Sequence, residues 1–380
     1  MKTILFVFGT RPEAIKMAPI LRLIAKGDQN FKTKVCVTAQ HREMLDQILD
    51  LFEITPDFDL DIMKERQDLT GLSASILVGM RDIYGSVSPD AVIVHGDTTT
   101  AMIAAQAAFY SGIPVGHVEA GLRTYDLQAP FPEEFNRQVI SKIASWHFAP
   151  TLNSKNNLLS EGVKEDQIYV TGNTVIDALL DIKTQINQDQ NWENKLSVNL
   201  KELCKDNIFD KQYILITGHR RENFGDGFVE ICQAVARLSK DYKDLNFVYP
   251  VHLNPQVREP VNKLLASLKN VYLIAPQDYD SFLFLLDRCF AVLTDSGGIQ
   301  EEAPSLGKPV LVMRDQTERP EAVSAGTVKL VGAHEQTIYQ GVEQLVNNPD
   351  LYNQMSRAHN PYGNGEASVK ILEVLNKVME

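Results

Sequence analysis

The stretch ILFVFGTRPEAIKMAPILRLIAK (residues 4–26) decides which kind of fold the chain can form. Residues 4–8 are a short apolar run, and Gly9 behind them allows the backbone to turn tightly. Pro12 suits the first turn of a helix, where a missing N–H costs nothing. Residues 13–26 then show the spacing of an amphipathic helix. A strand followed directly by a helix is the unit from which parallel α/β sheets are built.

The same alternation of apolar runs and helical segments continues along the chain. The further runs are residues 34–38, 91–95, 114–119 and 146–149, and then 213–217, 246–250, 271–275, 291–294 and 309–313. Strands buried on both faces read as continuous apolar runs, so we expect two parallel sheets covered by helices. Ligands bind at the carboxyl ends of such strands. The pattern therefore predicts two doubly wound, Rossmann-like α/β domains with an active-site cleft between them.

A polar interval separates the two series of runs. Residues 181–210 are rich in Asn, Gln, Lys and Asp and show no strand pattern. We therefore predict an N-terminal domain over residues 1–185 and a C-terminal domain over residues 186–365. Residues 366–380 read as a last helix, which we expect to pack back on the N-terminal domain.

Composition limits the class of protein. Of 380 residues, 44% are hydrophobic and 23% charged, as in a folded globular protein. A net charge of −12 disfavours attraction to nucleic acid or to an anionic membrane. The run at 4–8 is too short for a signal peptide, and no stretch approaches the ~20 apolar residues of a spanning helix. We expect a cytoplasmic protein that binds neither nucleic acid nor membrane.

Cofactor and metal sites leave recognisable patterns that this sequence lacks. The four cysteines form no C-x-x-C pair, which argues against a structural zinc and fits a reducing compartment. Histidine pairs with metal-binding spacing, a dinucleotide fingerprint and a Walker loop are also missing. We expect no metal and no cofactor.

Cations after the first strand are candidate anion ligands. Arg11 and Lys16 fall near the start of the first helix, where backbone N–H groups and the helix dipole favour negative charge. From the local sequence alone, two solvated surface cations are an equally good interpretation.

A second candidate anion site follows the run at 291–294. Ser296, Gly297 and Gly298 open a helix there, and small residues let bare N–H groups approach a phosphate. A capped helix start is the alternative, although two adjacent glycines weaken a helix. Glu302, one turn further on, could accept two hydroxyls of a ribose. Its neighbour Glu301 suits a structural role better.

Three carboxylates follow strands or open a helix in the first half. Asp97 comes just after the run at 91–95, Glu119 ends the run at 114–119, and Glu133 heads a helical segment. Neighbouring parallel strands bring their carboxyl ends to one rim, where acids repel and desolvate one another and become suited to proton transfer. Taken singly, Asp97 could instead cap the helix from residue 98, and Glu133 could be a first-turn partner of the helix dipole.

Histidines also stand at strand ends. His219 follows the run at 213–217 and could donate to a leaving phosphate or exchange a proton near neutrality. His252 suits a supporting role. His95 and His117 lie within apolar runs and are expected to be core histidines with their hydrogen bonds satisfied.

Seven segments occur in order along the chain: GTRPE (9–13), HGDTT (95–99), HVEAGLR (117–123), TGHRRE (217–222), TDSGGIQEE (294–302), TERPE (317–321) and NPYG (360–363). Together they resemble the motifs of the non-hydrolysing bacterial UDP-N-acetylglucosamine 2-epimerases. The resemblance implies an isomerase with the two-domain fold of the glycosyltransferase-B type, with UDP between the domains. It implies that UDP-N-acetylglucosamine and UDP-N-acetylmannosamine interconvert, by loss of UDP to 2-acetamidoglucal and its return.

The resemblance also assigns roles. Asp97, Glu119, Glu133 and His219 are implied to be catalytic. The implied substrate ligands are Arg11, Lys16, Gln277, Phe282, Ser296, Gly297, Gly298, Glu302 and Arg319. Some members bind a second substrate molecule as an activator, and the matching positions here are Gln40, His41 and Arg66, whereas Glu43 stands where some members have Gln. A homodimer that serves bacterial surface polysaccharide synthesis is implied as well.

The residues by themselves leave other functions open. A hydrolysing epimerase, a glycosyltransferase of the same architecture and a non-catalytic nucleotide-sugar sensor would each use a two-domain fold that grips a nucleotide diphosphate.

Overall fold

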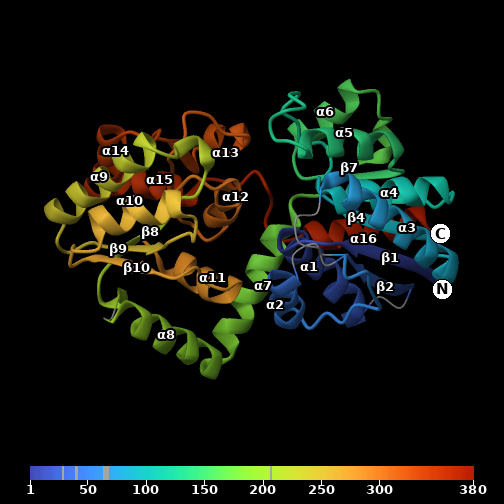
Figure 1. The fold of residues 1–380 in the computed structure, drawn as a ribbon, viewed down its shortest axis with the longest axis horizontal. Coiled ribbons are helices and arrows are strands. Elements are labelled where there is room, and N and C mark those ends of the chain that lie inside the picture. Colours follow the sequence, from blue (N-terminus) through green and yellow to red (C-terminus); the bar gives the residue numbers. More distant parts are fainter. Residues whose placement is uncertain (28–29, 39–41, 63–67, 206–207) are drawn as a thin grey trace. The chain divides into compact units, whose positions relative to one another are not determined.

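The computed structural model describes residues 1–27, 30–38, 42–62, 68–205 and 208–380 of the chain. It divides the chain into two compact units (Figure 1). Unit 1 comprises Met1–Ala178 and Tyr362–Glu380, and unit 2 comprises Leu179–Pro361. The domain boundaries expected at residues 185 and 365 stay a prediction.

Unit 1 is built on a seven-stranded parallel sheet with the order β3-β2-β1-β4-β5-β6-β7. Its strands are β1 (Lys2–Phe8), β2 (Phe31–Val37), β3 (Phe58–Asp59), β4 (Ala91–His95), β5 (Val115–Val118), β6 (Trp146–Ala149) and β7 (Ile168–Val170). Its helices are α1 (Arg11–Gly27), α2 (Arg42–Leu51), α3 (Leu69–Val87), α4 (Thr99–Tyr110), α5 (Glu133–Ile143), α6 (Leu152–Ser160) and α16 (Ala367–Val378). Helix α7 (Thr174–Gln188) begins in unit 1 and continues into unit 2.

Unit 2 is built on a six-stranded parallel sheet with the order β10-β9-β8-β11-β12-β13. Its strands are β8 (Tyr213–Thr217), β9 (Asn246–Pro250), β10 (Val271–Ile274), β11 (Ala291–Thr294), β12 (Val310–Val312) and β13 (Val328–Leu330). Its helices are α8 (Gln190–Cys204), α9 (Asp226–Asp241), α10 (Pro255–Leu265), α11 (Tyr279–Arg288), α12 (Gly297–Ser305), α13 (Pro320–Ser324), α14 (Glu335–Asn347) and α15 (Pro349–Arg357). Across the described part of the chain, each helix is either too short or too polar to cross a lipid bilayer.

The predicted α/β class is confirmed, because each predicted apolar run overlaps a strand. Strands β3, β7 and β13, of two or three residues each, were not predicted, because no apolar run was assigned there. The described part of the polar interval 181–210 holds the end of α7 and all of α8, together with a 3₁₀ turn at Ile208–Asp210.

The apolar strands are continuous because helices cover both faces of each sheet. In β1, Leu5 and Val7 join the core beneath α3 and α4. Ile4, Phe6 and Phe8 are also fully buried and point to the opposite face, on which α1 contacts β1. Figure 1 shows α1 and the C-terminal helix α16 side by side, and the two helices are in contact.

A buried carboxylate ties two strand ends of unit 1 together. Glu13, in the first turn of α1, is 2% exposed. It accepts hydrogen bonds from the backbone N–H of Gly9 (3.0 Å) and of Thr10 (2.9 Å), behind β1. Its second oxygen accepts from the hydroxyl of Thr98 (2.7 Å), behind β4. Burial raises the pKa of the Glu13 carboxyl to about 7, although these hydrogen bonds lower it.

Gly121 is a position at which only glycine fits. Its φ is +90°, and a Cβ placed there would lie 2.3 Å from the carbonyl oxygen of Ser154. We expect Gly121→Ala to lower the free energy of unfolding by about 2–4 kcal/mol, because backbone strain and overpacking add. Urea unfolding measures the change. Gly85→Ala, at an open position in α3, is the control and should stabilise the chain by up to about 1 kcal/mol.

Glu13 should make stability fall as pH rises. The folded chain keeps the Glu13 proton up to about pH 7, whereas the unfolded chain releases it near its ordinary value of 4.5. The folded state therefore binds more protons in this window, and stability declines from about pH 4.5 to about pH 7. In Glu13→Gln that decline should be missing when urea unfolding is measured across the same range.

The exposed Glu373→Gln controls for removal of one negative charge. If Glu13→Gln and wild type show parallel curves of stability against pH, Glu13 does not hold a proton in the folded chain.

Candidate functional site

Each sheet has one point at which the strand order reverses. In unit 1 the reversal lies between β1 and β4, and in unit 2 it lies between β8 and β11. The connections behind neighbouring strands run to opposite faces there, which leaves room for a ligand at the carboxyl ends. Most of the predicted site residues follow these strands or β5, the neighbour of β4.

Glu119 lies directly behind β5, with its backbone in the left-handed region (φ 63°). Its Oε2 atom forms an ion pair with the Nζ atom of Lys16, from α1. The same oxygen accepts a hydrogen bond of 2.8 Å from the amide of Asn173, behind β7. The Lys16 side chain is only 13% exposed, so the interpretation as a solvated surface cation is wrong for Lys16. Arg11, the first residue of α1, is half-buried.

Asp97 is held by helix α5. Its carboxylate forms an ion pair with Arg137, and its backbone carbonyl accepts a hydrogen bond of 2.8 Å from the amide of Asn136. Asp97 is not the helix cap, because the hydroxyl of Thr98 caps α4 by accepting from the N–H of Ala101.

The two acids that open α5 differ in burial. Glu133 is partly exposed, and no hydrogen bond or ion pair links it to Asp97 or Glu119 within the described residues. Glu134 is fully buried and accepts from the N–H groups of Thr124 (3.0 Å) and Tyr125 (3.1 Å). It also accepts from the Nη1 atom of Arg137 (3.2 Å), whereas Asp97 pairs with Nη2 of the same guanidinium.

Arg137 and Asn173 were missed by sequence reasoning. Arg137 lies one helical turn beyond Glu133 and Glu134, a spacing at which charges pair. Asn173 follows β7, a strand too short to be predicted, so its place at a strand end was hidden.

In unit 2, Asp295 ties the ends of β8 and β11 together. It is fully buried, and its carboxylate accepts from the backbone N–H groups of His219 (3.0 Å) and Arg220 (2.9 Å). The amide of Asn223 donates to the same carboxylate (3.2 Å). The ring of His219 stacks on that of His252, with 5.4 Å between the centroids. Burial lowers the pKa of His219 below its ordinary value, against the opposing charge of Asp295.

At the start of α12, a helix N-terminus and the guanidinium of Arg319 lie close together. Ser296 is the N-cap residue, and its side chain makes no capping hydrogen bond. The guanidinium of Arg319 lies directly over Gly297, where a Cβ would come within 2.7 Å of Nη1. Arg319 is oriented by Glu301, which is buried and accepts from its Nε atom (2.8 Å). Burial and this contact are compatible with the structural role expected for Glu301, which stays a prediction.

The remaining predicted residues lie elsewhere. Gln277 follows β10, at the edge of the sheet, and its side chain donates to the carbonyl of Ala275 (2.7 Å). Phe282 is half-buried in α11. Glu302 is half-buried in α12. Gln40, His41 and Arg66 lie outside the described residues.

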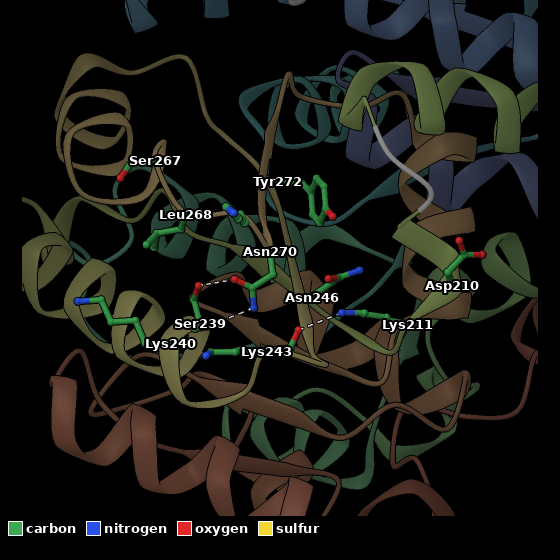
Figure 2. Close-up of a pocket in the computed structure, with 11 residues that line it drawn as sticks. Asp210, Lys211, Ser239, Lys240, Lys243, Asn246, Ser267, Leu268, Asn270 and Tyr272 are labelled. Carbon is green, nitrogen blue, oxygen red and sulfur yellow. Dashed lines mark hydrogen bonds between the residues drawn. The ribbon is translucent and has the colours of Figure 1, made fainter.

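A cavity of about 580 Å³ in unit 2 lies at the opposite end of the sheet (Figure 2). Asn246 begins β9, Tyr272 belongs to the start of β10, and both line it. The side chain of Asn270 donates to the carbonyls of Ser239, Tyr242 and Leu245, so this polar lining holds the loops of the fold. Because ligands bind at the carboxyl ends of parallel strands, this cavity is not the candidate site. No group of three or more metal-ligating side chains occurs in the described ranges.

Known proteins resemble this chain over nearly its full length. The family profile described as UDP-N-acetylglucosamine 2-epimerase matches residues 24–376. The UDP-N-acetylglucosamine 2-epimerase of Escherichia coli K12 is 56% identical over 372 residues, which cover 98% of each chain. The crystal structure of the enzyme from Neisseria meningitidis bound to UDP-GlcNAc is 52% identical, with a TM-score of 0.90, over 99% of this chain and 100% of that one.

A more distant structure shows the fold alone. A glycosyltransferase from Rickettsia africae is 15% identical and superimposes with a TM-score of 0.64 over 100% of this chain and 99% of that one. The fold is therefore of the glycosyltransferase-B type, as predicted. From the family match and the identity along both chains, it follows that this chain belongs to the UDP-N-acetylglucosamine 2-epimerases, a family of isomerases.

Proposed function

We propose that the chain inverts C2 of UDP-N-acetylglucosamine reversibly, by elimination and return of UDP. The observation that carries the proposal is the pair of carboxylates behind neighbouring strands, Asp97 behind β4 and Glu119 behind β5, each held by a cation. The Neisseria relative, solved with UDP-GlcNAc bound, supports the choice of substrate.

The chemistry explains why both acids and cations are needed. No carbonyl next to C2 activates its hydrogen, so direct removal of the proton is prohibitively hard. When the C1–O bond breaks, its electron pair leaves with UDP and positive charge grows on the ring, which makes C2–H acidic. A carboxylate then takes the proton and a C1=C2 double bond forms, giving 2-acetamidoglucal. Delivery of a proton to the opposite face of C2, and return of UDP to C1, gives UDP-N-acetylmannosamine.

We propose that unit 2 holds the UDP. The N–H groups at the start of α12, together with Arg319 over Gly297, suit a diphosphate, and His219 suits its departure from C1. Lys16 and Arg11 are proposed to assist the leaving diphosphate, and Glu302 to hold the ribose. Gln277 and Phe282 are proposed to complete the nucleotide site, and Glu133 to serve as a third catalytic acid. The homodimer, the activator site and the role in surface polysaccharide synthesis stay predictions from the family.

Incubation with UDP-N-acetylglucosamine in deuterated water tests the reaction. We expect NMR to show the manno isomer with deuterium at C2 and with UDP still attached. Asp97→Asn and Glu119→Gln should each lower the rate of isotope exchange by at least about 100-fold, because each removes an acid–base or charged group. Calorimetry should show UDP binding largely kept in both variants.

Other outcomes would identify other functions. Release of free N-acetylmannosamine with stoichiometric UDP would show a hydrolysing enzyme. If Asp97→Asn and Glu119→Gln both keep the full biological function of the chain, the protein is a non-catalytic nucleotide-sugar sensor.

Gly297→Ala should displace Arg319 and weaken UDP binding. The new methyl group would meet the guanidinium at 2.7 Å, and losing one charge-assisted contact costs about tenfold in Kd. Arg319→Gln should weaken binding to a similar extent, and the double variant should be no worse than either single one. Calorimetric titration with UDP measures all three. Additive losses would mean that Gly297 and Arg319 act independently.

A further inference from the structure

Lys16 and Asn173 both contact the Glu119 carboxylate as hydrogen-bond donors. The ammonium of Lys16 has no lone pair to offer. The amide of Asn173 presents its NH₂ to Glu119, because its oxygen already accepts from the N–H of Val175 (3.0 Å). Such partners stabilise the ionised carboxylate. They offer nothing to the O–H group that Glu119 carries once it has taken a proton.

The side chain of His95 lies beside the same oxygen. His95 ends β4, and its Nε2 atom is 3.8 Å from Oε2 of Glu119. The side chain is 4% exposed, and neither ring nitrogen has a hydrogen-bond partner among the residues that the structure describes. The expectation of a satisfied core histidine is therefore wrong for His95. It is better met by His117, whose Nε2 lies 2.7 Å from the carbonyl oxygen of Gly96.

A buried polar group without a partner requires an explanation, because leaving it unpaired costs about 1–3 kcal/mol. Burial lowers the pKa of His95 to about 4, with Glu119 opposing that shift and Lys16 adding to it. The ring is therefore neutral at pH 7, and one of its nitrogens keeps a free lone pair.

We infer that the neutral ring of His95 accepts the hydrogen bond of Glu119 whenever that carboxyl group is protonated during turnover. The proton comes from the broken C2–H bond, whose electrons form the C1=C2 double bond as UDP leaves. It forms the Glu119 O–H bond, and a shift of about 1 Å brings that group to hydrogen-bond distance of Nε2. His95 is thus a positioning residue that acts through Glu119. The inference rests on the proposed acid–base role of Glu119.

Two variants separate the acceptor from the volume of the ring. His95→Leu removes the acceptor and keeps an apolar side chain, and we expect kcat to fall by at least about 30-fold with KM and the Kd for UDP within about twofold of wild type. His95→Gln keeps an oxygen that can accept, and it should recover most of that loss. Deuterium exchange at C2 should follow kcat in both variants.

His147→Leu is the matched control. His147 is also buried, its pKa is lowered to about 4 by burial, and it lies on β6. This substitution should lower thermal stability about as much as His95→Leu and leave kcat nearly unchanged.

Equal loss of kcat in His95→Leu and His147→Leu, or no rescue by His95→Gln, would overturn the inference. If Glu119→Gln is inactive while His95→Leu keeps full kcat, the inference fails and the proposed function stands. If Glu119→Gln keeps turnover, the acid–base role itself fails.

Discussion

The order of the parallel strands determines where most of the candidate site residues lie. The order reverses between β1 and β4 in unit 1, and between β8 and β11 in unit 2. At each reversal a buried carboxylate ties the two strand ends together. Glu13 takes the N–H groups behind β1 and a hydroxyl behind β4, and Asp295, behind β11, takes the N–H groups behind β8. The loops that carry the candidate residues are thereby fixed before any ligand binds, which is what a preorganised site requires.

The second feature that shapes the site is the pairing of charges. In a chain of net charge −12, single cations in helices or at a helix start pair with the carboxylates in and around the candidate site. Lys16 of α1 meets Glu119, Arg137 of α5 meets Asp97 and Glu134, and Arg319 before α13 meets Glu301. Removal of one of these cations would leave a carboxylate without its ionic partner.

The sequence predicts the strands and the strand-end residues well, because both follow from local pattern. Long apolar runs mark β1, β4, β8 and β11, and polar residues just behind them must lie at the carboxyl rim. Residues that contact the candidate carboxylates from other elements show no such local pattern in the sequence. Arg137 comes from a helix face and Asn173 follows a three-residue strand, so their contacts with Asp97 and Glu119 emerge only when the chain is folded.

For His95, too, the local sequence predicts only part of the environment. Its place in an apolar run correctly predicts burial, but the neighbouring residues do not indicate whether its ring nitrogens have hydrogen-bond partners. The two carboxylates consequently differ in a way that sequence cannot show. Asp97 faces the guanidinium of Arg137, which only donates hydrogen bonds and is always charged. Glu119 has donors and, within reach, a neutral ring with a lone pair. A residue that acts as both acid and base needs hydrogen-bond partners in its protonated form and in its ionised form. In the proposed reaction, Glu119 therefore has partners for both of its protonation states, whereas Arg137 offers Asp97 donors alone.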